Sequence, residues 1–580
     1  MKLHLPKILC VAVMSLFVGS AMGGTLTSST YTGEDGQEHT KWDVGTYEYG
    51  KIPNKQYTNL SNEDFTLDGY DMLGTYDDDG NLVTRYYDCD SAANSTKISP
   101  SLKTTGTVTI KDYAQLSLGG LYTDGQWYTG LIANKLIIDA KDDPNRVNFR
   151  TTAAKLTDVE IKGGTALFHH AYHFTGSGTE GGTNQGNQAA WGTSFFYGDT
   201  NEDGGKIVAI SGTYTQSGGN VRFGAANASP HTHSSGTKFY YGQAFKGVIT
   251  QTGGSMNIYG HTIYEGSSIT QSGNGEMYFR DRIYLTKSSV SIQQGGSNTA
   301  ATDMPKMIIG KLYGNSTPTA VVLKQTNAGI MTLAYGTNFT KACTVTVDQS
   351  GNGTINIGGG HDMKSTDLSG FEAANTTYNF QQTSGTINIA NNATVHSNKL
   401  ALDTNALLNI AGSLTLNDGG TFEIAVNSAH DAAMNLGDNG TFSIAATTQA
   451  LSLSLHEAVV SDMMDTVESA MESGLLTYTI DLISATDKGT LEDLKGKLTW
   501  EWEELPQTAA LAADTLTTVV TYDYIDSKLI VNDMGDGTYM LQAATNWNVT
   551  VTEPIPEPAT ATLSLLALAG LAARRRRASR

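Results

Sequence analysis

The sequence predicts an all-β protein whose middle part is a parallel β-helix, a repeat solenoid, with a small C-terminal α+β cap. A turn motif of Gln, then Ser or Thr, then Gly or Asn recurs through the middle of the 580-residue chain. The runs beside these turns alternate apolar and polar residues, the period of half-buried strands. Gly, Ser, Thr and Asn crowd this region, as expected for stacked strands joined by many tight turns.

The first element is a secretion signal. Residues 1–21 contain Lys2 and Lys7, an apolar stretch from Ile8 to Val18 and a final run of small residues. This order is that of a secretory signal peptide, so we expect the segment to be removed on export. Cys10 stands at the start of the apolar core rather than after it, which argues against attachment of a lipid.

Residues 22–99, rich in Tyr, Asp and Gly, come next and are expected to form an N-terminal cap or a ligand-facing extension. A repeat array needs caps because an uncovered terminal coil exposes unpaired backbone groups. The run Asp77-Asp78-Asp79-Gly80 within this segment has the composition of a hairpin turn.

Residues 100–450 carry the repeats. The turn motif begins at Gln216, Gln251, Gln271, Gln293, Gln325, Gln349 and Gln382. The spacings fall into two sets, roughly 20–24 and 32–35 residues, as a basic unit with occasional loop insertions would produce. Weaker copies, such as Thr107–Ile110 and Phe442–Ile444, extend the pattern in both directions.

The strands beside the turns are too short to bury their own apolar face, so coils must stack on one another. The apolar positions include Ile249, Met256, Ile258, Ile269, Met277, Phe279, Val345, Val347, Ile355, Ile357, Ile387 and Ile389. Gln and Asn at equivalent places are expected to form hydrogen-bonded ladders along the stack. At about 4.8 Å per coil the region would make a rod on the order of 70 Å long. It resembles the passenger domains of autotransporters; tandem β-sandwiches are the alternative architecture.

Residues 451–545 are expected to form a separate cap. Ser454 and Glu457 have the spacing of a capping box, and the apolar residues between Val460 and Met471 fall on one helical face. Alternating strands follow, ending in a hairpin, Lys528 to Leu541, around Gly535-Asp536-Gly537.

The C-terminal end has three elements in a fixed order. Residues 546–558 form a linker that ends in Pro556, Glu557 and Pro558, and residues 559–580 are an apolar run followed by Arg574, Arg575, Arg576 and Arg577. This end resembles the PEP-CTERM sorting signal of exported Gram-negative bacterial proteins. The resemblance implies processing by an exosortase, a membrane enzyme that cuts near the tripeptide.

The physical properties of this end agree with transient membrane insertion. The arginines hold the C-terminus on the cytoplasmic side. The apolar run from Ala559 to Ala573 is shorter than the roughly 20 residues of a stable span. The alternative is an ordinary C-terminal anchor that is never processed.

The balance of charge bears on the partners. The chain has a net charge of -20, and its two signals carry seven basic residues and no acids, so the processed chain is near -27. Such acidity argues against nucleic acid or an anionic membrane surface as the partner. Of the two cysteines outside the signal peptide, Cys89 and Cys343, the stacking would place one many coils from the other, so both are expected to be free thiols.

One metal site is suggested by the sequence. Asp199, Asn201 and Asp203 place oxygen ligands at alternate positions before Gly204, as in the first half of a calcium loop. The twelfth position is Ile210, which lacks the bidentate carboxylate, so an acidic surface turn is the competing interpretation. Apart from this possible calcium, no cofactor is expected.

No complete catalytic constellation is found in the sequence, which favours a noncatalytic structural or adhesin-like protein of the cell surface, the outer membrane or the extracellular matrix. Its expected partners are surface glycans or exopolysaccharide, or further copies of itself. Aromatic residues expected at coil edges would provide the contacts: Tyr240, Tyr241, Tyr259, Tyr264, Tyr278, Phe279 and Tyr284. The alternative is a polysaccharide lyase or glycoside hydrolase on the same scaffold.

Overall fold

The computed structural model describes residues 27–33, 35–43, 58–59, 64–74, 102–118, 121–123, 126–128, 130–143, 146–151, 154–168, 208–224, 231–232, 238–239, 242–259, 261–296, 305–314, 320–360, 370–426, 431–468, 472–500, 508–512 and 519–552. These residues lie almost entirely in β-strands, which confirms the predicted all-β class. The predicted signal peptide and sorting tail lie outside the described residues.

The strands are short in the N-terminal half and longer toward the C-terminus. Those up to residue 168 are β1 (Thr27–Thr32), β2 (Glu38–Asp43), β3 (Thr58–Asn59), β4 (Phe65–Leu67), β5 (Met72–Gly74), β6 (Leu102–Lys103), β7 (Thr107–Asp112), β8 (Gln115–Leu118), β9 (Leu121–Thr123), β10 (Gln126–Tyr128), β11 (Leu131–Ala140), β12 (Phe149–Thr151), β13 (Ala154–Gly163) and β14 (Thr165–Phe168). The next are β15 (Val208–Ile210), β16 (Tyr214–Gln216), β17 (Asn220–Phe223), β18 (His231–Thr232), β19 (Lys238–Phe239), β20 (Gly242–Phe245), β21 (Ile249–Gln251), β22 (Ser255–Ile258), β23 (His261–Tyr264), β24 (Ser268–Ser272), β25 (Glu276–Leu285), β26 (Ser289–Gly295), β27 (Lys306–Gly314), β28 (Ala320–Gln325), β29 (Ile330–Leu333), β30 (Gly336–Gln349) and β31 (Thr354–Ile357). The last are β32 (Glu372–Ile389), β33 (Thr394–Ile410), β34 (Ser413–Val426), β35 (Met434–Leu436), β36 (Thr441–Ile444), β37 (Gln449–Leu455), β38 (Gly474–Ala485), β39 (Leu498–Thr499), β40 (Thr508–Ala512), β41 (Val519–Asp533) and β42 (Tyr539–Thr552), with helices α3 (Glu457–Glu468) and α4 (Lys488–Lys497).

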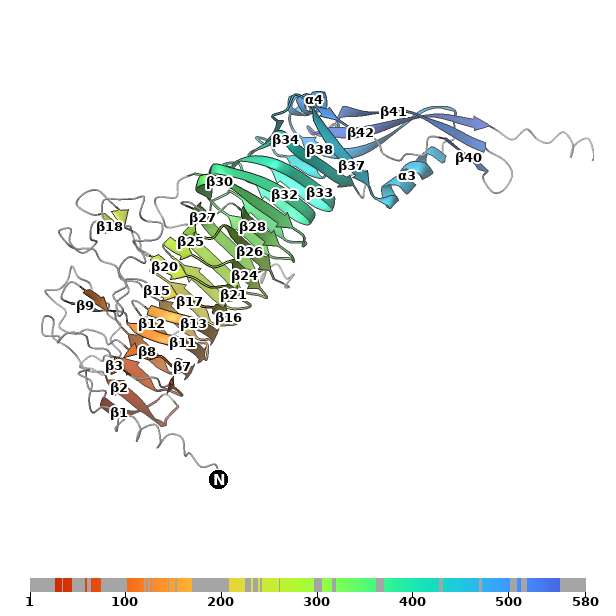
Figure 1. Ribbon diagram of the computed structural model, residues 1–580. Helices are drawn as coiled ribbons and strands as arrows, with labels where there is room; N and C mark the ends of the chain where they lie inside the picture. Colours follow the sequence, from red (N-terminus) through yellow and green to blue (C-terminus); the bar gives the residue numbers. More distant parts are fainter. Residues whose placement is uncertain are drawn as a thin grey trace, which may run out of the picture.

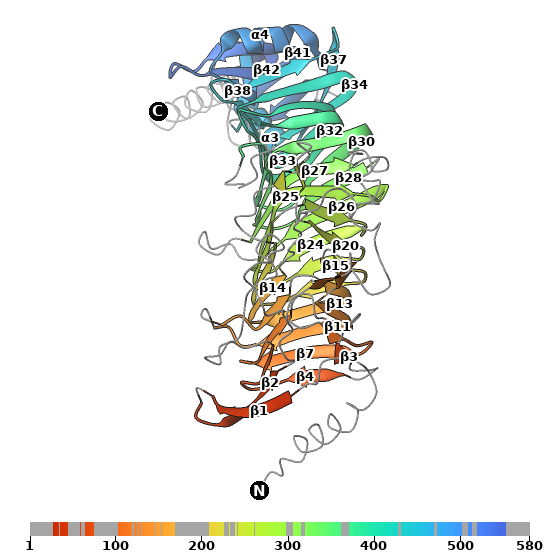
Figure 2. The ribbon, with the colours of Figure 1, turned by 90° about the vertical axis from the view of Figure 1, so that its left-hand side faces the viewer.

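Most strands pair in parallel with a strand one turn of the chain later. In one ladder β16 pairs with β21, β21 with β24 and β24 with β26. A second ladder runs through β17, β22 and β25, and a third through β15, β20 and β23. The parallel-paired strands from β2 to β38, here called the strand stack, follow one another along the long axis of the molecule (Figures 1 and 2).

Antiparallel pairing is confined, among the described residues, to the strand pairs β1–β2, β9–β10 and β18–β19 and to the C-terminal strands β38, β40, β41 and β42. Tandem β-sandwiches, the alternative prediction, are built from antiparallel sheets joined by hairpins and Greek keys. The pairing within the strand stack does not have that character.

Inward-facing side chains form columns of apolar residues along the stack. One column, whose members are each at most 1 % exposed, consists of Ile258, Phe279, Ile309, Leu333, Ile357, Ile389 and Ile410. All twelve apolar positions predicted from the alternation are buried in this way. Each coil therefore covers the apolar face of the coil before it, which a single coil cannot do for itself.

A column of glutamines runs beside the apolar core. Its members are in register on successive strands and are each at most 1 % exposed: Gln216, Gln251, Gln271, Gln294, Gln325, Gln349 and Gln382. The predicted ladder of hydrogen-bonded glutamines is confirmed from Gln271 to Gln349, and at the fourth turn Gln294 and not Gln293 faces inward.

The glutamine amides bond both to one another and to the turns. Gln349 Nε2 donates to Gln325 Oε1 at 2.6 Å, and Gln325 Nε2 donates to Gln294 Oε1 at 3.1 Å. Gln349 Nε2 also lies 2.8 Å from the carbonyl oxygen of Gly351 and 3.0 Å from that of Gly353. The glutamine side chains thus donate hydrogen bonds to carbonyl groups of the turns that point inward. Buried polar groups need such hydrogen-bond partners.

The turns need glycine because successive turns approach each other closely. Gly254 has a φ of +74°, and a Cβ at this position would lie 2.3 Å from the carbonyl oxygen of Gly219, the equivalent residue of the preceding coil. A side chain is therefore excluded both by backbone conformation and by the neighbouring coil.

The stack begins earlier than predicted. β4 pairs in parallel with β7, and β5 with β8, so residues within the segment 22–99 already belong to it. β2 and β3 also pair in parallel, with β5 and β6, so among the described residues only β1 precedes the stack, and it pairs with β2 in antiparallel fashion. The prediction placed the boundary at residue 100 because these first strands are only two or three residues long and have no Gln turn beside them.

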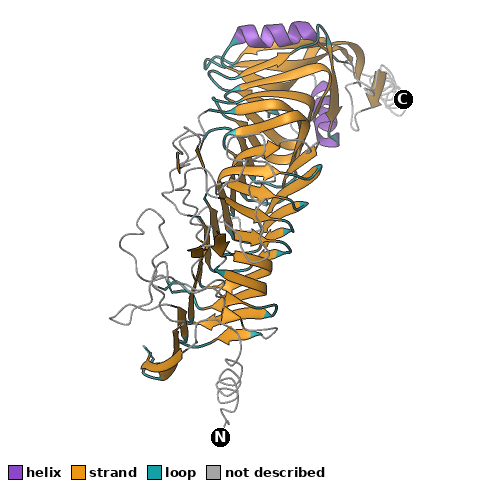
Figure 3. Cartoon of the chain, turned by 60° about the vertical axis from the view of Figure 1, so that its left-hand side comes forward, coloured by secondary structure: helices purple, strands orange, loops and turns teal. Residues whose placement is uncertain are grey.

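The C-terminal cap is an antiparallel sheet with two helices. β42 lies between β38 and β41, and the end of β38 pairs in parallel with β35, so the sheet continues directly from the stack. Helix α4 covers the end of the molecule opposite to β1 (Figure 2), and is the helix drawn at the top of Figure 3. The predicted hairpin around Gly535 is present, but β42 runs to Thr552, so residues 546–552 are strand and not linker.

Helix α3 differs from its prediction at its start. Ser454 lies in β37, and His456 takes the cap position instead, because its carbonyl oxygen and its Nδ1 accept the N–H groups of Val459 and Ala458. Met463 and Val467 are buried, as the predicted apolar face requires. Helix α4 was not predicted. Neither described helix has the length and apolar character needed to cross a membrane.

Candidate functional site

The sequence predicts two recognition sites, one for an exosortase and one for calcium. The sorting-signal residues Pro556–Pro558 and Arg574–Arg577, and the possible calcium ligands Asp199, Asn201 and Asp203, lie outside the described residues. Among the residues that are described, no group of three or more His, Cys, Asp or Glu side chains could hold a metal ion.

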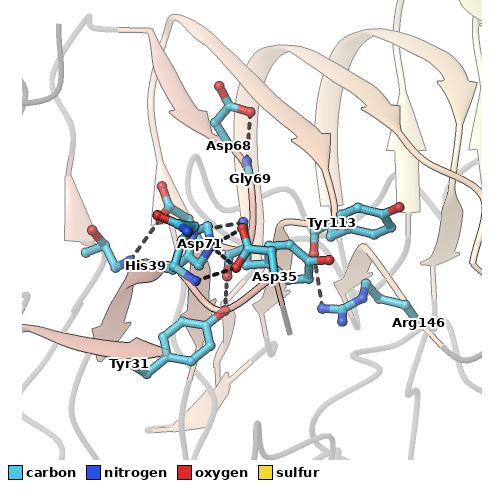
Figure 4. Close-up of polar contacts among 11 residues, drawn as sticks. Tyr31, Asp35, His39, Asp68, Gly69, Asp71, Tyr113 and Arg146 are labelled. Carbon is cyan, nitrogen blue, oxygen red and sulfur yellow. Dashed lines mark hydrogen bonds and ion pairs between the residues drawn. The ribbon is translucent and has the colours of Figure 1, made fainter. Parts of the chain in front are cut away.

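A row of aromatic and cationic side chains lies at the N-terminal end of the stack (Figure 4). His39 on β2 is 8 % exposed, and its Nε2 lies 2.9 Å from both carboxylate oxygens of Asp35. Its Nδ1 accepts the backbone N–H of Tyr70 at 3.3 Å. Since an accepting nitrogen carries no proton, the proton of this imidazole sits on Nε2 and points at Asp35. The hydroxyl of Tyr31 donates to the carbonyl oxygen of Tyr70.

The next coils extend this row. The rings of Tyr70 and Tyr113 stack with their centroids 4.8 Å apart, the spacing of neighbouring coils. The guanidinium of Arg146 lies 5.2 Å from the first ring and 5.6 Å from the second, and its Nη1 donates to the carbonyl oxygen of Tyr113. Lys141 lies 5.1 Å from the Tyr113 ring and forms an ion pair of 3.1 Å with Asp112. The ring faces are thus largely occupied by neighbouring side chains, so the row offers ring edges and not open faces to a ligand.

A second patch lies on the outer side of the central coils. The guanidinium of Arg280 lies 4.9 Å from the ring of Tyr278 and 5.2 Å from that of Tyr259. Its Nε and Nη2 both donate to Asn257 Oδ1, at 3.1 and 3.0 Å. Partial burial, and then the neighbouring Glu276 carboxylate, raise the pKa of Tyr278 to about 12, so its hydroxyl keeps its proton at neutral pH. We call Tyr259, Tyr278 and Arg280 the tyrosine–arginine patch.

A third group, the charged cluster, consists of Asp281, Arg282, Lys311, Tyr313 and Glu372. Lys311 is 1 % exposed, and its Nζ lies 2.7 Å from Glu372 Oε1. The guanidinium of Arg282 lies 5.1 Å from the Tyr313 ring. Burial raises the pKa of Asp281 to about 6, although the charge of Arg282, 3.8 Å away, opposes this shift.

The structure corrects the set of aromatic residues expected to face a ligand. Tyr264 and Phe279 are at most 1 % exposed and Tyr284 is 9 % exposed, because each packs among the stacked apolar side chains. Tyr259 and Tyr278 are half-buried at the surface, and Tyr240 and Tyr241 lie outside the described residues. The alternation of residues along one strand does not distinguish covered from exposed outward side chains, because neighbouring chain segments cover some outward positions and leave others open.

The charged cluster was missed by the sequence reasoning, although Lys311 gives a usable signal. It interrupts the apolar run Met307–Leu312 of β27, where a charged side chain requires a partner.

Cys343 is a free, buried thiol, and burial raises its pKa to about 12. Cys89 lies outside the described residues.

No protein-family model, curated protein or solved structure matches this chain.

Proposed function

We propose that the chain is an exported, noncatalytic scaffold of the cell surface or extracellular matrix, built as a parallel β-helix and delivered through its C-terminal sorting signal. The observation that carries this proposal is the continuity of the parallel pairing from β2 to β38. Each coil covers the last, and the glutamine column satisfies the turns, so the chain can maintain a long, regular surface without a large globular core.

The sorting part of the proposal rests on the order of the tripeptide, the apolar run and the arginines at the C-terminus. Intact-mass measurement of protein isolated from its native host tests it. The expected species lacks both the signal peptide and everything after about Pro558. A mature species that still carries Arg574–Arg577 would rule out cleavage by an exosortase and leave the ordinary anchor.

The binding part assigns the contact with glycans or with further copies to the tyrosine–arginine patch. Tyrosines and arginine combine flat apolar faces with hydrogen-bonding groups, as sugar rings and protein partners require. Arg280→Ala should weaken retention on an exopolysaccharide matrix, or self-association in sedimentation velocity, at least tenfold. Lys287→Ala, which removes an exposed charge from the loop after β25, is the control. Equal behaviour of the two variants would exclude the patch.

Catalysis is the second candidate, and Asp281 is the observation that favours it. A carboxyl with a pKa near 6 next to a cation suits general acid–base catalysis. Its 5 % exposure argues against contact with a polysaccharide chain. Mucin, pectin and exopolysaccharide are suitable substrates for assays of reducing ends and unsaturated sugars. Turnover that Asp281→Asn abolishes would replace the scaffold proposal with the enzyme.

A further inference from the structure

Two side chains from different strands meet at the carboxylate of a third on the outer side of the stack. Glu372 on β32 accepts Lys311 Nζ at Oε1 and Asn338 Nδ2 at Oε2, and both distances are 2.7 Å. Lys311 lies on β27 and Asn338 on β30, strands that pair directly with each other. An amine and a carboxamide from separate parts of the sequence therefore each contact one oxygen of the same proton-accepting carboxylate.

The surroundings of Lys311 favour a reactive amine. Burial lowers the pKa of its ammonium group, and the charge of Arg282, its partner in register on β25, lowers it further, although Glu372 opposes this. A lysine that is desolvated and close to another cation is a general form of activated nucleophile. The ring of Tyr313, 5.6 Å from Nζ, forms an apolar wall beside it.

The position of Glu372 suits a proton relay. Burial raises the pKa of this carboxyl, but the hydrogen bonds from Lys311 and Asn338 outweigh burial, and the pKa is lowered overall. The group is therefore ionised and can accept a proton from the ammonium. Its other oxygen contacts Asn338 Nδ2, the nitrogen that would leave in a transfer of the acyl group.

We propose that Lys311 and Asn338 form an intramolecular amide bond, with Glu372 as the proton relay. Lys311 gives one ammonium proton to Glu372, and the neutral Nζ attacks Asn338 Cγ. Glu372 then protonates Nδ2, the bond between Cγ and Nδ2 breaks, and ammonia leaves. A second proton is lost from Nζ through Glu372 to solvent, so the product keeps one N–H. No oxidant, metal or energy source is required.

The bond would connect two coils covalently on the outer side of the stack. It would close a loop that includes β28 and β29, which lie between β27 and β30 in the sequence, and so restrict the unfolded chain as other cross-links do. Such a link cannot be reduced, in contrast to a disulfide.

The test is mass spectrometry of the folded recombinant protein without its two signals. We expect an intact mass lower by one ammonia, and a proteolytic product that joins the peptides containing Lys311 and Asn338. Lys311→Arg, Asn338→Ala and Glu372→Gln should each abolish this loss, with unchanged far-UV circular dichroism. Asn338→Asp should still form the link and lose one water instead. A full, unlinked mass after prolonged incubation would overturn the proposal, and so would simple deamidation of Asn338.

Lys324 and Asp348 provide the matched control. They form an ion pair of 2.9 Å between the paired strands β28 and β30, but the interaction joins only an amine and a carboxylate. Lys324→Arg should leave the loss of ammonia unchanged. If Glu372→Gln forms the link as fast as the parent chain, Glu372 is not the relay and the assignment of its role is wrong.

Discussion

Buried glutamines contribute to the specificity of the stack at the scale of single residues. Gln325 illustrates the arrangement: it accepts from Gln349, donates to Gln294 and donates to the carbonyl oxygen of Gly329 at 3.2 Å. A buried amide that makes these bonds is stable, whereas one that loses a partner costs free energy. The column therefore favours the register in which equivalent turns lie above one another.

Gln325→Ala tests this arrangement. The substitution removes the donor to Gln294 Oε1 and one of the three acceptors of the Gln349 amide, which should lower the free energy of unfolding by about 2–4 kcal/mol. Urea unfolding followed by far-UV circular dichroism measures the effect. Gln293→Ala, at a half-buried outward position one coil earlier, should cost less than about 0.5 kcal/mol. Similar costs for the two variants would show that the column does not stabilise the stack.

Asp281 should make stability depend on pH. Burial raises its pKa in the folded protein to about 6, above the value near 3.8 of an exposed carboxyl, so the folded state holds its proton to higher pH. The unfolded state then binds fewer protons between these values, and stability falls as pH rises from about 4 to about 6. The total loss is on the order of 3 kcal/mol.

Asp281→Asn removes the titration and provides the comparison. The midpoint of urea unfolding of the variant should stay nearly constant over this pH range. At pH 7 the variant should be more stable than the parent chain. Asp348→Asn, at a partly exposed position, controls for general loss of negative charge. A parent chain whose stability changes between pH 4 and pH 6 by no more than that of the Asp281→Asn variant would contradict the burial of a protonated Asp281.

At the scale of elements, the sequence predicted the positions of the strands more accurately than those of the helices. The alternation of apolar residues located the strands because one face of each strand is buried along the whole stack. Helix α4 escaped prediction because only Leu491 and Leu494 face the core, which is too few to produce a visible helical period. The start of α3 was misplaced because Ser454 extends β37, where pairing with β34 overrides its capping preference.

The caps of the helices can be tested with one pair of variants. The Asp487 carboxylate accepts the backbone N–H of Thr490 at 2.9 Å and that of Gly489 at 3.2 Å, and so caps α4. Asp487→Ala should lower the thermal unfolding midpoint of the C-terminal sheet by about 1–3 °C. Ser454→Ala should leave it unchanged, since Ser454 caps no helix. Fluorescence of the buried Trp547 reports on this sheet.

At the scale of the whole molecule, the ladder of paired strands determines the length. One ladder passes through β4, β7, β11, β13, β16, β21, β24, β26, β28, β30, β32, β33, β34 and β37. At about 4.8 Å for each step, these strands span on the order of 65 Å. Small-angle scattering should therefore show an elongated particle with an asymmetric distance distribution. A compact, symmetric distribution would contradict the stacking.

The sequence by itself determined the all-β class, the inward positions of the strands and the glutamine turns, because each depends on a local pattern repeated in every coil. Tertiary structure alone decided which outward side chains are covered, where the stack begins and which residues from different coils meet. Lys311 and Asn338 both contact Glu372 because parallel pairing brings the separate strands β27, β30 and β32 into register. The connections between coils vary irregularly in length, so the spacing of the three residues in the sequence does not reveal these contacts.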